Sequence, residues 1–253
     1  MRLPVFVTIG TATAWLLLTS SVAGSAQEPI RLHIDDPRPV AAAVFEVEKR
    51  FGRIVTYEDT SYVHASDIID VTEQVRRDGD MSKRVLVMRN VIVDLTFMPR
   101  SPSVDEWIGE LLANIIASST AAGNTGDFKV APRANAFHVV PVSRKGDKGT
   151  LEPYASPLDA AITLPFRNET GAAFMERFAR AVSAASARQV TPGTFPINLF
   201  MQRGVALSAQ EENARDVLWR ALQGIRQDLS WRLLCDVGER GMCAINIHTI
   251  PQR

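Results

Sequence analysis

The sequence predicts an α+β protein made of two tandem modules, each with the element order β-α-β-β-α-β-β and with helices packed against small sheets. Two observations support this fold class. Amphipathic stripes at helical spacing alternate with short β-rich runs along the chain. The same order of elements also occurs twice, once over residues 27–143 and once over 158–253. A repeated order of elements indicates duplication of one structural unit.

The first 26 residues are predicted to be a signal peptide (1–26) that is not part of the fold. Arg2 supplies the positive start, an apolar stretch follows, and Gly24-Ser25-Ala26 offers small residues for cleavage before Gln27. The alternative is an uncleaved membrane anchor. Thr and Gly interrupt the apolar stretch, however, and it falls short of the ~20 residues that span a bilayer. We therefore expect a periplasmic or secreted protein.

The mature chain is almost neutral. Without Arg2 it holds 27 Lys and Arg residues against 28 Asp and Glu residues, a net charge of −1. Domains that bind nucleic acid carry a basic face, and polybasic segments bind membranes, so neither partner is expected. The apolar fraction of 46% is that of an ordinary globular protein, and no transmembrane segment is expected in the mature chain.

The first module begins with a strand over 30–34 and a helix that starts at Asp36-Pro37 and ends at Gly52. An acidic N-cap, a proline in the first turn and a glycine after the last turn are typical helix boundaries. A strand follows over 53–57. Further along are β-rich residues at 84–97, a helix from 104 opened by a capping box of Ser103 and Glu106, and a hairpin of 128–130 and 137–142.

Residues 58–83 interrupt the first module as an insertion. They are polar and show little apolar periodicity, so we expect a long excursion that is at most partly ordered. Aromatic and Arg side chains are enriched at recognition surfaces. A variable surface loop without a binding role is the competing interpretation. The possible interaction residues are Tyr57 at the entry and Tyr62, His64, Arg76 and Arg77 inside the segment.

Residues 144–157 are charged and contain Gly and Pro, and they are predicted to be a linker. The second module, 158–253, repeats the element order. In sequence order we expect a strand over 158–164, a helix capped by Asn168, strands over 189–190 and 197–207, a helix opened by a capping box of Ser208 and Glu211, and a final hairpin of 229–235 and 243–247.

Cys235 and Cys243 are predicted to form a disulfide across the final hairpin. If they face each other, Leu233 faces Ile245 and Trp231 faces Ile247, which gives the hairpin one uniformly apolar face. Opposed residues in an antiparallel pair lie ~4.5–5.5 Å apart, within the range that a disulfide accepts. Two reduced thiols are the alternative, and two sulfurs fall short of the four ligands of a structural zinc.

The sequence shows no motif or spacing of residues that is typical of an active site. The four histidines are His33, His64, His138 and His248, and none lies within four residues of another, so no helix presents two of them to a metal. We expect no catalytic residues, no metal and no cofactor. The alternative is an enzyme whose site between the two modules uses His64, Asp67 or His138.

One stretch resembles a known family. The helix pattern from Ala214 to Leu222, the aromatic-bearing run Leu229–Leu233 and the closing run Ile245–Ile247 are similar to the short N-terminal domain shared by secretins and TonB-dependent receptors. The similarity is best over residues 208–248, and the first module matches the same pattern more weakly. The resemblance implies two helices packed between two small sheets in each module, and a docking or signalling role in the periplasm.

These observations together predict an exported, non-enzymatic protein that binds another protein or an envelope component. Open sheet edges and the excursion at 58–83 are the two surfaces through which it would bind.

Overall fold

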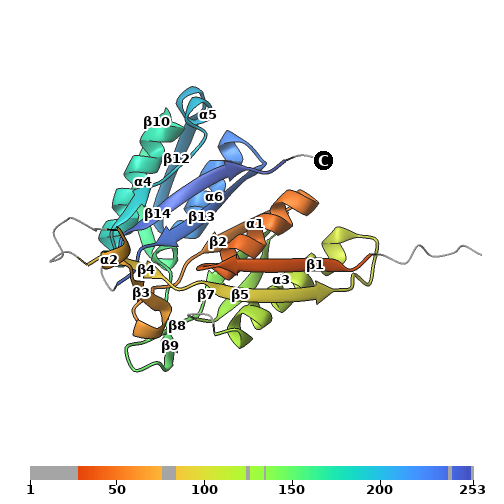
Figure 1. The fold of residues 1–253 in the computed structure, drawn as a ribbon. Coiled ribbons are helices and arrows are strands. Elements are labelled where there is room, and N and C mark those ends of the chain that lie inside the picture. Colours follow the sequence, from red (N-terminus) through yellow and green to blue (C-terminus); the bar gives the residue numbers. More distant parts are fainter. Residues whose placement is uncertain (1–27, 76–83, 124–125, 134, 239–240, 252–253) are drawn as a thin grey trace, which may run out of the picture.

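The computed structural model describes residues 28–75, 84–123, 126–133, 135–238 and 241–251 (Figure 1). Helix makes up 36% and strand 39%, with helices packed against several small sheets, so the predicted α+β fold class is confirmed. In the described part of the chain, no helix is long and apolar enough to cross a membrane. The predicted signal peptide lies outside the described residues.

The elements of the first half come in the predicted order, with additions inside the insertion. Its strands are β1 (Ile30–Asp36), β2 (Ile54–Glu58), β3 (Ile68–Asp70), β4 (Leu86–Met88), β5 (Val91–Phe97), β6 (Phe128–Arg133) and β7 (Ala136–Pro141). Its helices are α1 (Pro39–Phe51), α2 (Thr72–Val75) and α3 (Val104–Ala121), with a 3-10 turn, η1, over Ala65–Asp67.

A hairpin of β8 (Ser143–Lys145) and β9 (Leu151–Pro153) connects the halves and overlaps the predicted linker. The strands of the second half are β10 (Ala161–Thr170), β11 (Val190–Pro192), β12 (Gly204–Asn213), β13 (Leu229–Cys235) and β14 (Cys243–Thr249). Its helices are α4 (Gly171–Ser186), α5 (Ile197–Gln202) and α6 (Ala214–Ile225), with a 3-10 turn, η2, over Pro157–Asp159.

Both halves pair their strands in the same way. β1 pairs antiparallel with β5, as β10 does with β12. β2 runs parallel beside β7, which pairs antiparallel with β6, and β11 runs parallel beside β14, which pairs antiparallel with β13. The repetition seen in the order of elements therefore extends to strand pairing, and each half packs its two long helices between two sheets.

A single six-stranded sheet joins the halves, in the order β11-β14-β13-β2-β7-β6. The join is a parallel pairing of β13 with β2, in which Leu233 lies opposite Glu58. Side chains of a strand alternate between faces, and in β2 Val55 packs into the core of the first half while Ile54 packs into that of the second. Helices α1 and α3 thus cover one face of the shared sheet, and α4 and α6 cover the other (Figure 1).

The final hairpin has the predicted register. Cys235 lies opposite Cys243, Leu233 opposite Ile245 and Trp231 opposite Ile247. The two cysteines form the predicted disulfide, with their Cα atoms 4.0 Å apart. Both are fully buried in the core of the second half, so the covalent link and the apolar face reinforce each other.

The predicted capping box of Ser208 and Glu211 is wrong, because both residues lie in β12. Alternate apolar residues of this segment pair it with β10, and this pairing outweighs the local helix signal. The side chain of Asn213 caps α6 instead and accepts a hydrogen bond from the backbone N–H of Arg215 at 3.0 Å. Ser103 does precede α3 as predicted, although its side chain makes no capping hydrogen bond.

Two further local expectations are wrong. Asn168 lies inside β10, and α4 is capped by Thr170, whose side chain accepts from the backbone N–H of Ala173 at 3.3 Å. Residues 197–202 form the short helix α5 and not a strand. The end of α1 at Gly52 is confirmed, with the left-handed backbone (φ 63°) that favours glycine.

Candidate functional site

The start of the predicted insertion is buried where the two halves meet. Asp59, Thr60 and Ser61 have no exposed surface, and Tyr62 is 1% exposed. The backbone N–H of Asp59 donates to the carbonyl of Leu233 at 2.8 Å, and the N–H of Gly238 donates to the carbonyl of Tyr62 at 2.8 Å. Residues 59–62 therefore extend β2 along the last hairpin, and the expectation of a loosely ordered segment is wrong for them.

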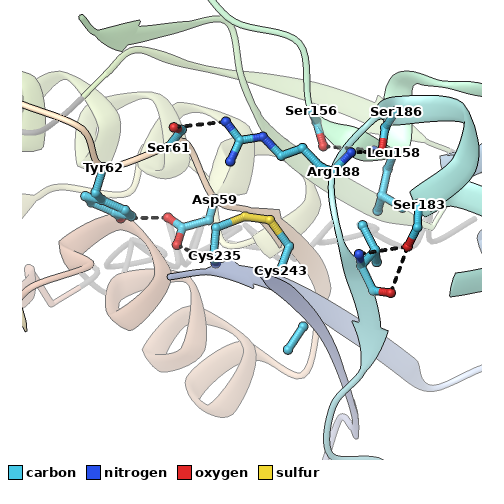
Figure 2. The surroundings of a disulfide bond; sticks show 12 residues. Asp59, Ser61, Tyr62, Ser156, Leu158, Ser183, Ser186, Arg188, Cys235 and Cys243 are labelled. Carbon is cyan, nitrogen blue, oxygen red and sulfur yellow. Dashed lines mark hydrogen bonds between the residues drawn. A yellow bond between two sulfur atoms is a disulfide. The ribbon is translucent and has the colours of Figure 1, made fainter. Parts of the chain in front are cut away.

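Asp59 is the centre of this buried region. Its Oδ1 accepts hydrogen bonds from the hydroxyls of Tyr57 at 2.8 Å and Tyr62 at 2.6 Å. Its Oδ2 accepts from Nε of Arg38 at 2.7 Å and from the backbone N–H of Cys235 at 3.1 Å. Figure 2 shows Tyr62 pointing at this carboxylate beside the disulfide. The carboxylate is therefore both neutralised and fully hydrogen-bonded, as a buried charge requires.

Burial chiefly, and next the negative charge of Asp59, raise the pKa of Tyr57 and of Tyr62 well above the usual value. Both hydroxyls consequently keep their protons and act as donors. Arg38 also donates to the carbonyl of Cys235 at 2.6 Å. The first turn of α1, the end of β2 and the disulfide hairpin are thus linked through one carboxylate.

A second buried carboxylate, that of Glu58, is held by α6. Arg215 donates from Nε and Nη2 to the two carboxylate oxygens of Glu58, at 2.5 and 2.7 Å, and also lies 2.8 Å from Asp159. Burial lowers the pKa of Arg215, but the hydrogen bonds and charges of Glu58 and Asp159 raise it by more, so the net pKa lies above the ordinary value. This paired fork is a geometry that arginine favours.

Ser61 completes the contact. Its hydroxyl oxygen accepts from Arg144 at 3.2 Å and from Arg188 at 3.1 Å, and Figure 2 shows Arg188 reaching it. We call residues Glu58–Tyr62 together with Arg38, Arg144, Arg188 and Arg215 the seam. Each of its two carboxylates is paired with a guanidinium group, and the pair of Glu58 with Arg215 links the two halves.

The predicted interaction residues lie in different environments. Tyr57 and Tyr62 are buried in the seam, at 1% exposure, so their side chains do not face an external partner, and this part of the expectation is corrected. His64 is half-buried and lies just outside the seam. Arg76 and Arg77 lie outside the described residues.

The structure brings His64 and Asp67 together around Ser66. The hydroxyl oxygen of Ser66 lies 2.7 Å from Nδ1 of His64, and Lys145 donates to Asp67 at 2.7 Å. Ser66, Asp67 and Lys145 line an open cleft of about 570 Å³. The same His64 nitrogen accepts from the backbone N–H of Ser66 at 3.2 Å and caps η1, which accounts for this geometry without catalysis.

His138, the third residue of the enzyme alternative, does not join this cluster. It is 3% exposed, packs against Trp219 and Trp231, and hydrogen-bonds the hydroxyl of Thr56 at 2.6 Å. Burial first, and then the positive charge of Arg133 and Arg215, lower its pKa to about 4. The imidazole is therefore neutral at neutral pH and is buried.

Sequence reasoning missed the four arginines of the seam. One lies just before α1, one in β8, one just after α4 and one in the first turn of α6, so no local spacing groups them. One signal was present. The polar run Glu58-Asp59-Thr60-Ser61 follows a β-rich run without Gly or Pro, so the strand is free to continue into it.

Among the described residues, no three His, Cys, Asp or Glu side chains gather as metal ligands. Comparison with known proteins gives no match to a family model, to a curated protein or to a solved structure. The resemblance to the short N-terminal domain of secretins and TonB-dependent receptors therefore stays a prediction from sequence patterning.

Proposed function

We propose that this chain is an exported, non-enzymatic docking protein that binds another protein or an envelope component, with its two halves acting as one body. The observation that carries the proposal is the seam. Removing one partner from a buried ion pair costs about 3–5 kcal/mol, so the pair of Glu58 with Arg215 opposes separation of the halves. Asp59 and Arg38, both in the first half, add hydrogen bonds to the backbone of Cys235 in the second. A fixed arrangement of two modules offers a large surface of constant shape.

Two features support export. The disulfide between Cys235 and Cys243 is of a kind that persists in oxidising compartments. The predicted signal peptide would deliver the chain there. The layout of two helices between two small sheets in each half is also the one that the resemblance implies, and it supports a docking role in the periplasm.

The free edges of the shared sheet are poorly suited to a partner strand. Its outermost strands are β6 and β11, and each contains a proline, Pro132 and Pro192. Proline lacks an N–H and limits the addition of a strand at an edge. Docking by strand addition therefore falls to the outer two-stranded sheets, β1–β5 and β10–β12.

The test uses the mature chain from Gln27, immobilised in oxidised form and exposed to envelope extract. We expect saturable capture of a discrete partner that excess soluble mature chain displaces. The matched control is the same chain after reduction, alkylation and denaturation. It should capture no protein whose binding is displaced by excess folded chain.

Several results would count against the proposal. If excess soluble folded chain does not displace the captured protein, the docking role is contradicted. A protein isolated from its source with Met1 intact and free thiols would contradict export. Hydrolysis of an activated ester that is lost on Ser66→Ala would favour the enzyme alternative, because Ser66 is the hydroxyl next to His64.

A further inference from the structure

We propose that the outer edge of β11 is closed to strand addition, so that a second copy of this chain does not add to it by the pairing that joins the two halves. The strand that would add is β6 of the second copy. Closure of this edge keeps the shared sheet at two modules. The inference is independent of the proposed docking function.

The join between the halves is of a kind that can repeat. β2 and β11 hold the same place in their halves, each parallel to a neighbouring strand (β7 or β14), and β6 and β13 also hold the same place. The join pairs β13 with β2, and the free edges of the shared sheet, β6 and β11, are strands of the same two kinds. A contact between two unlike surfaces does not close on itself, so copies joined from β6 to β11 would grow into an open chain.

The ends of α1 and α4 align the edges of β2 and β11 residue by residue. Gly52 and Ala187 each follow the last helical turn, and both have left-handed backbone, with φ of 63° and 54°. The spacing from these two residues gives four pairs of counterparts: Val55 and Val190, Tyr57 and Pro192, Glu58 and Gly193, and Asp59 and Thr194.

Backbone hydrogen bonds show which residues of β11 face the free edge. The carbonyl of Gln189 accepts from β14 at 2.8 Å, and the N–H of Gly193 donates to β14 at 2.9 Å. Both residues therefore direct their backbone groups toward β14. Because these groups alternate in direction along a strand, those of Val190 and Pro192 face outward.

The outward backbone groups of this edge are already satisfied or missing. The N–H of Val190 donates to the hydroxyl of Ser183 at 2.8 Å, and the same hydroxyl lies 3.0 Å from the Val190 carbonyl oxygen. Pro192 has no N–H, and the hydroxyl of the preceding residue donates to its carbonyl at 3.3 Å. The N–H of Thr194 donates to the side chain of Asn246 at 3.0 Å. Over residues 190–194, all within the described chain, an added strand would find no free outward N–H.

The join shows how the counterparts act when the edge is open. The N–H of Asp59, the counterpart of Thr194, donates to the carbonyl of Leu233 in β13 at 2.8 Å. Tyr57 lies two residues earlier, so its backbone also faces β13, and unlike Pro192 it carries an N–H. The edges of β2 and β11 thus correspond in position, but only that of β2 offers donors to a further strand.

The ion pair of the join is not repeated at the free edges either. Glu58 pairs with Arg215, the second residue of α6. The counterpart of Glu58 is Gly193, and the second residue of α3 is Asp105. A contact of β6 with β11 would therefore bring together a glycine and an acidic residue where the join has opposite charges.

The edge of β6 is only partly closed. The N–H of Val142 donates to the carbonyl of Asp127 at 2.8 Å, and this places the outward backbone groups of β6 at Val130 and Pro132. Pro132 has no N–H, whereas Val130 has one. Closure against a second copy therefore depends chiefly on β11.

The test opens the two edges in separate proteins. The first variant, Pro132→Val, restores an N–H to β6. The second combines Ser183→Ala with Pro192→Val, which frees the backbone of Val190 and restores an N–H to β11. Each variant mixed with wild type is the matched control. Sedimentation velocity over a concentration series measures association of the mature chains, and urea denaturation checks that each variant is folded.

We expect wild type to stay monomeric. The two variants should form a one-to-one complex at least about tenfold tighter than either forms with itself or with wild type. The amide of Val130 in the first variant should gain protection from hydrogen exchange in that complex. In wild type alone, the amides of Val190 and Thr194 should be protected although β11 is an outermost strand, and Ser183→Ala should speed exchange at Val190 at least about tenfold.

Three association results would overturn the proposal: wild type that associates through β6 and β11, folded variants that do not associate, or a variant that binds itself as tightly as it binds the other. Fast exchange of Val190 and Thr194 in wild type would also overturn it, and this measurement decides the question if a variant does not fold. Capture of an envelope partner by the mature chain tests the docking function alone.

Discussion

At the scale of single residues, Asp59 is the acceptor at the centre of the seam's hydrogen bonds. We expect Asp59→Asn to lower the free energy of unfolding by about 3–5 kcal/mol, because the neutral amide leaves the buried charge of Arg38 unpaired and replaces an acceptor oxygen with a donor group. Urea denaturation monitored by tryptophan fluorescence measures the change. The control is Asp94→Asn, at the solvent-exposed pair with His33, which should leave the denaturation midpoint unchanged.

The lowered pKa of His138 predicts how the stability of the fold depends on pH. Its pKa is about 4 in the fold against an ordinary 6.5. Between these values the unfolded chain binds a proton that the folded chain does not, so this residue lowers stability as pH falls from about 6.5 to 4 and has no such effect above that window. The difference of pKa corresponds to about 3 kcal/mol when the window is fully crossed.

The measurement compares wild type with His138→Asn in urea denaturation at a series of pH values. Asparagine keeps a polar group for Thr56 but does not titrate in this window. The variant is expected to be less stable at neutral pH, because it leaves space between Trp219 and Trp231, yet its stability should fall less on acidification. Parallel pH profiles for the two proteins would contradict a neutral buried imidazole.

At the scale of elements, the disulfide hairpin is expected to contribute a defined amount. Replacing Cys235 and Cys243 together by alanine should lower the free energy of unfolding by about 2.5 kcal/mol, the chain-entropy value for so short a loop. Both sulfurs are fully buried, so alanine avoids placing a hydroxyl in the core. Urea denaturation of the variant and of oxidised wild type gives the difference. Equal stabilities would mean that the register of β13 and β14 is held by apolar pairing alone.

This same hairpin shows what sequence predicts well. A period of two and a pair of cysteines leave one register that places all large apolar residues on one face, and that register is the one observed. The box of Ser208 and Glu211 failed for a related reason. Its residues carry a helix-start pattern, yet they belong to a ten-residue strand whose partner, β10, lies about 40 residues earlier in the chain. A local helix-start pattern is overridden where pairing with a strand distant in sequence determines the secondary structure.

At the scale of the whole molecule, the doubled order of elements was predictable, but the joining of the halves was not. The pairing of β2 with β13 brings together residues such as Glu58 and Leu233, far apart in sequence. The seam has the same origin, since Arg215 and Glu58 meet only after both halves have formed. Tyr62 was expected at the surface because its burial depends on contacts from the other half and leaves no trace in local patterning.

The shared sheet predicts how the molecule behaves when it is divided. Expressed separately, residues 27–157 expose the edge of β2 with an unpaired Glu58, and residues 158–253 expose the edge of β13. We expect neither fragment to reach the stability of the intact chain, and the mixture to form a one-to-one complex by sedimentation velocity. Assembly restores the buried ion pairs and the backbone hydrogen bonds of the join.

Two variants of the second fragment distinguish specific assembly through the seam from non-specific association of the fragments. Arg215→Ala should weaken assembly strongly, because it leaves the fully buried Glu58 without its cation. Arg220→Ala, at the exposed pair with Glu212 on the same helix, should leave assembly unchanged. Fragments that fold independently and remain monomeric when mixed would show that the halves are separate bodies. In that case a fixed two-module surface could not be the basis of docking, and any partner would bind one half alone.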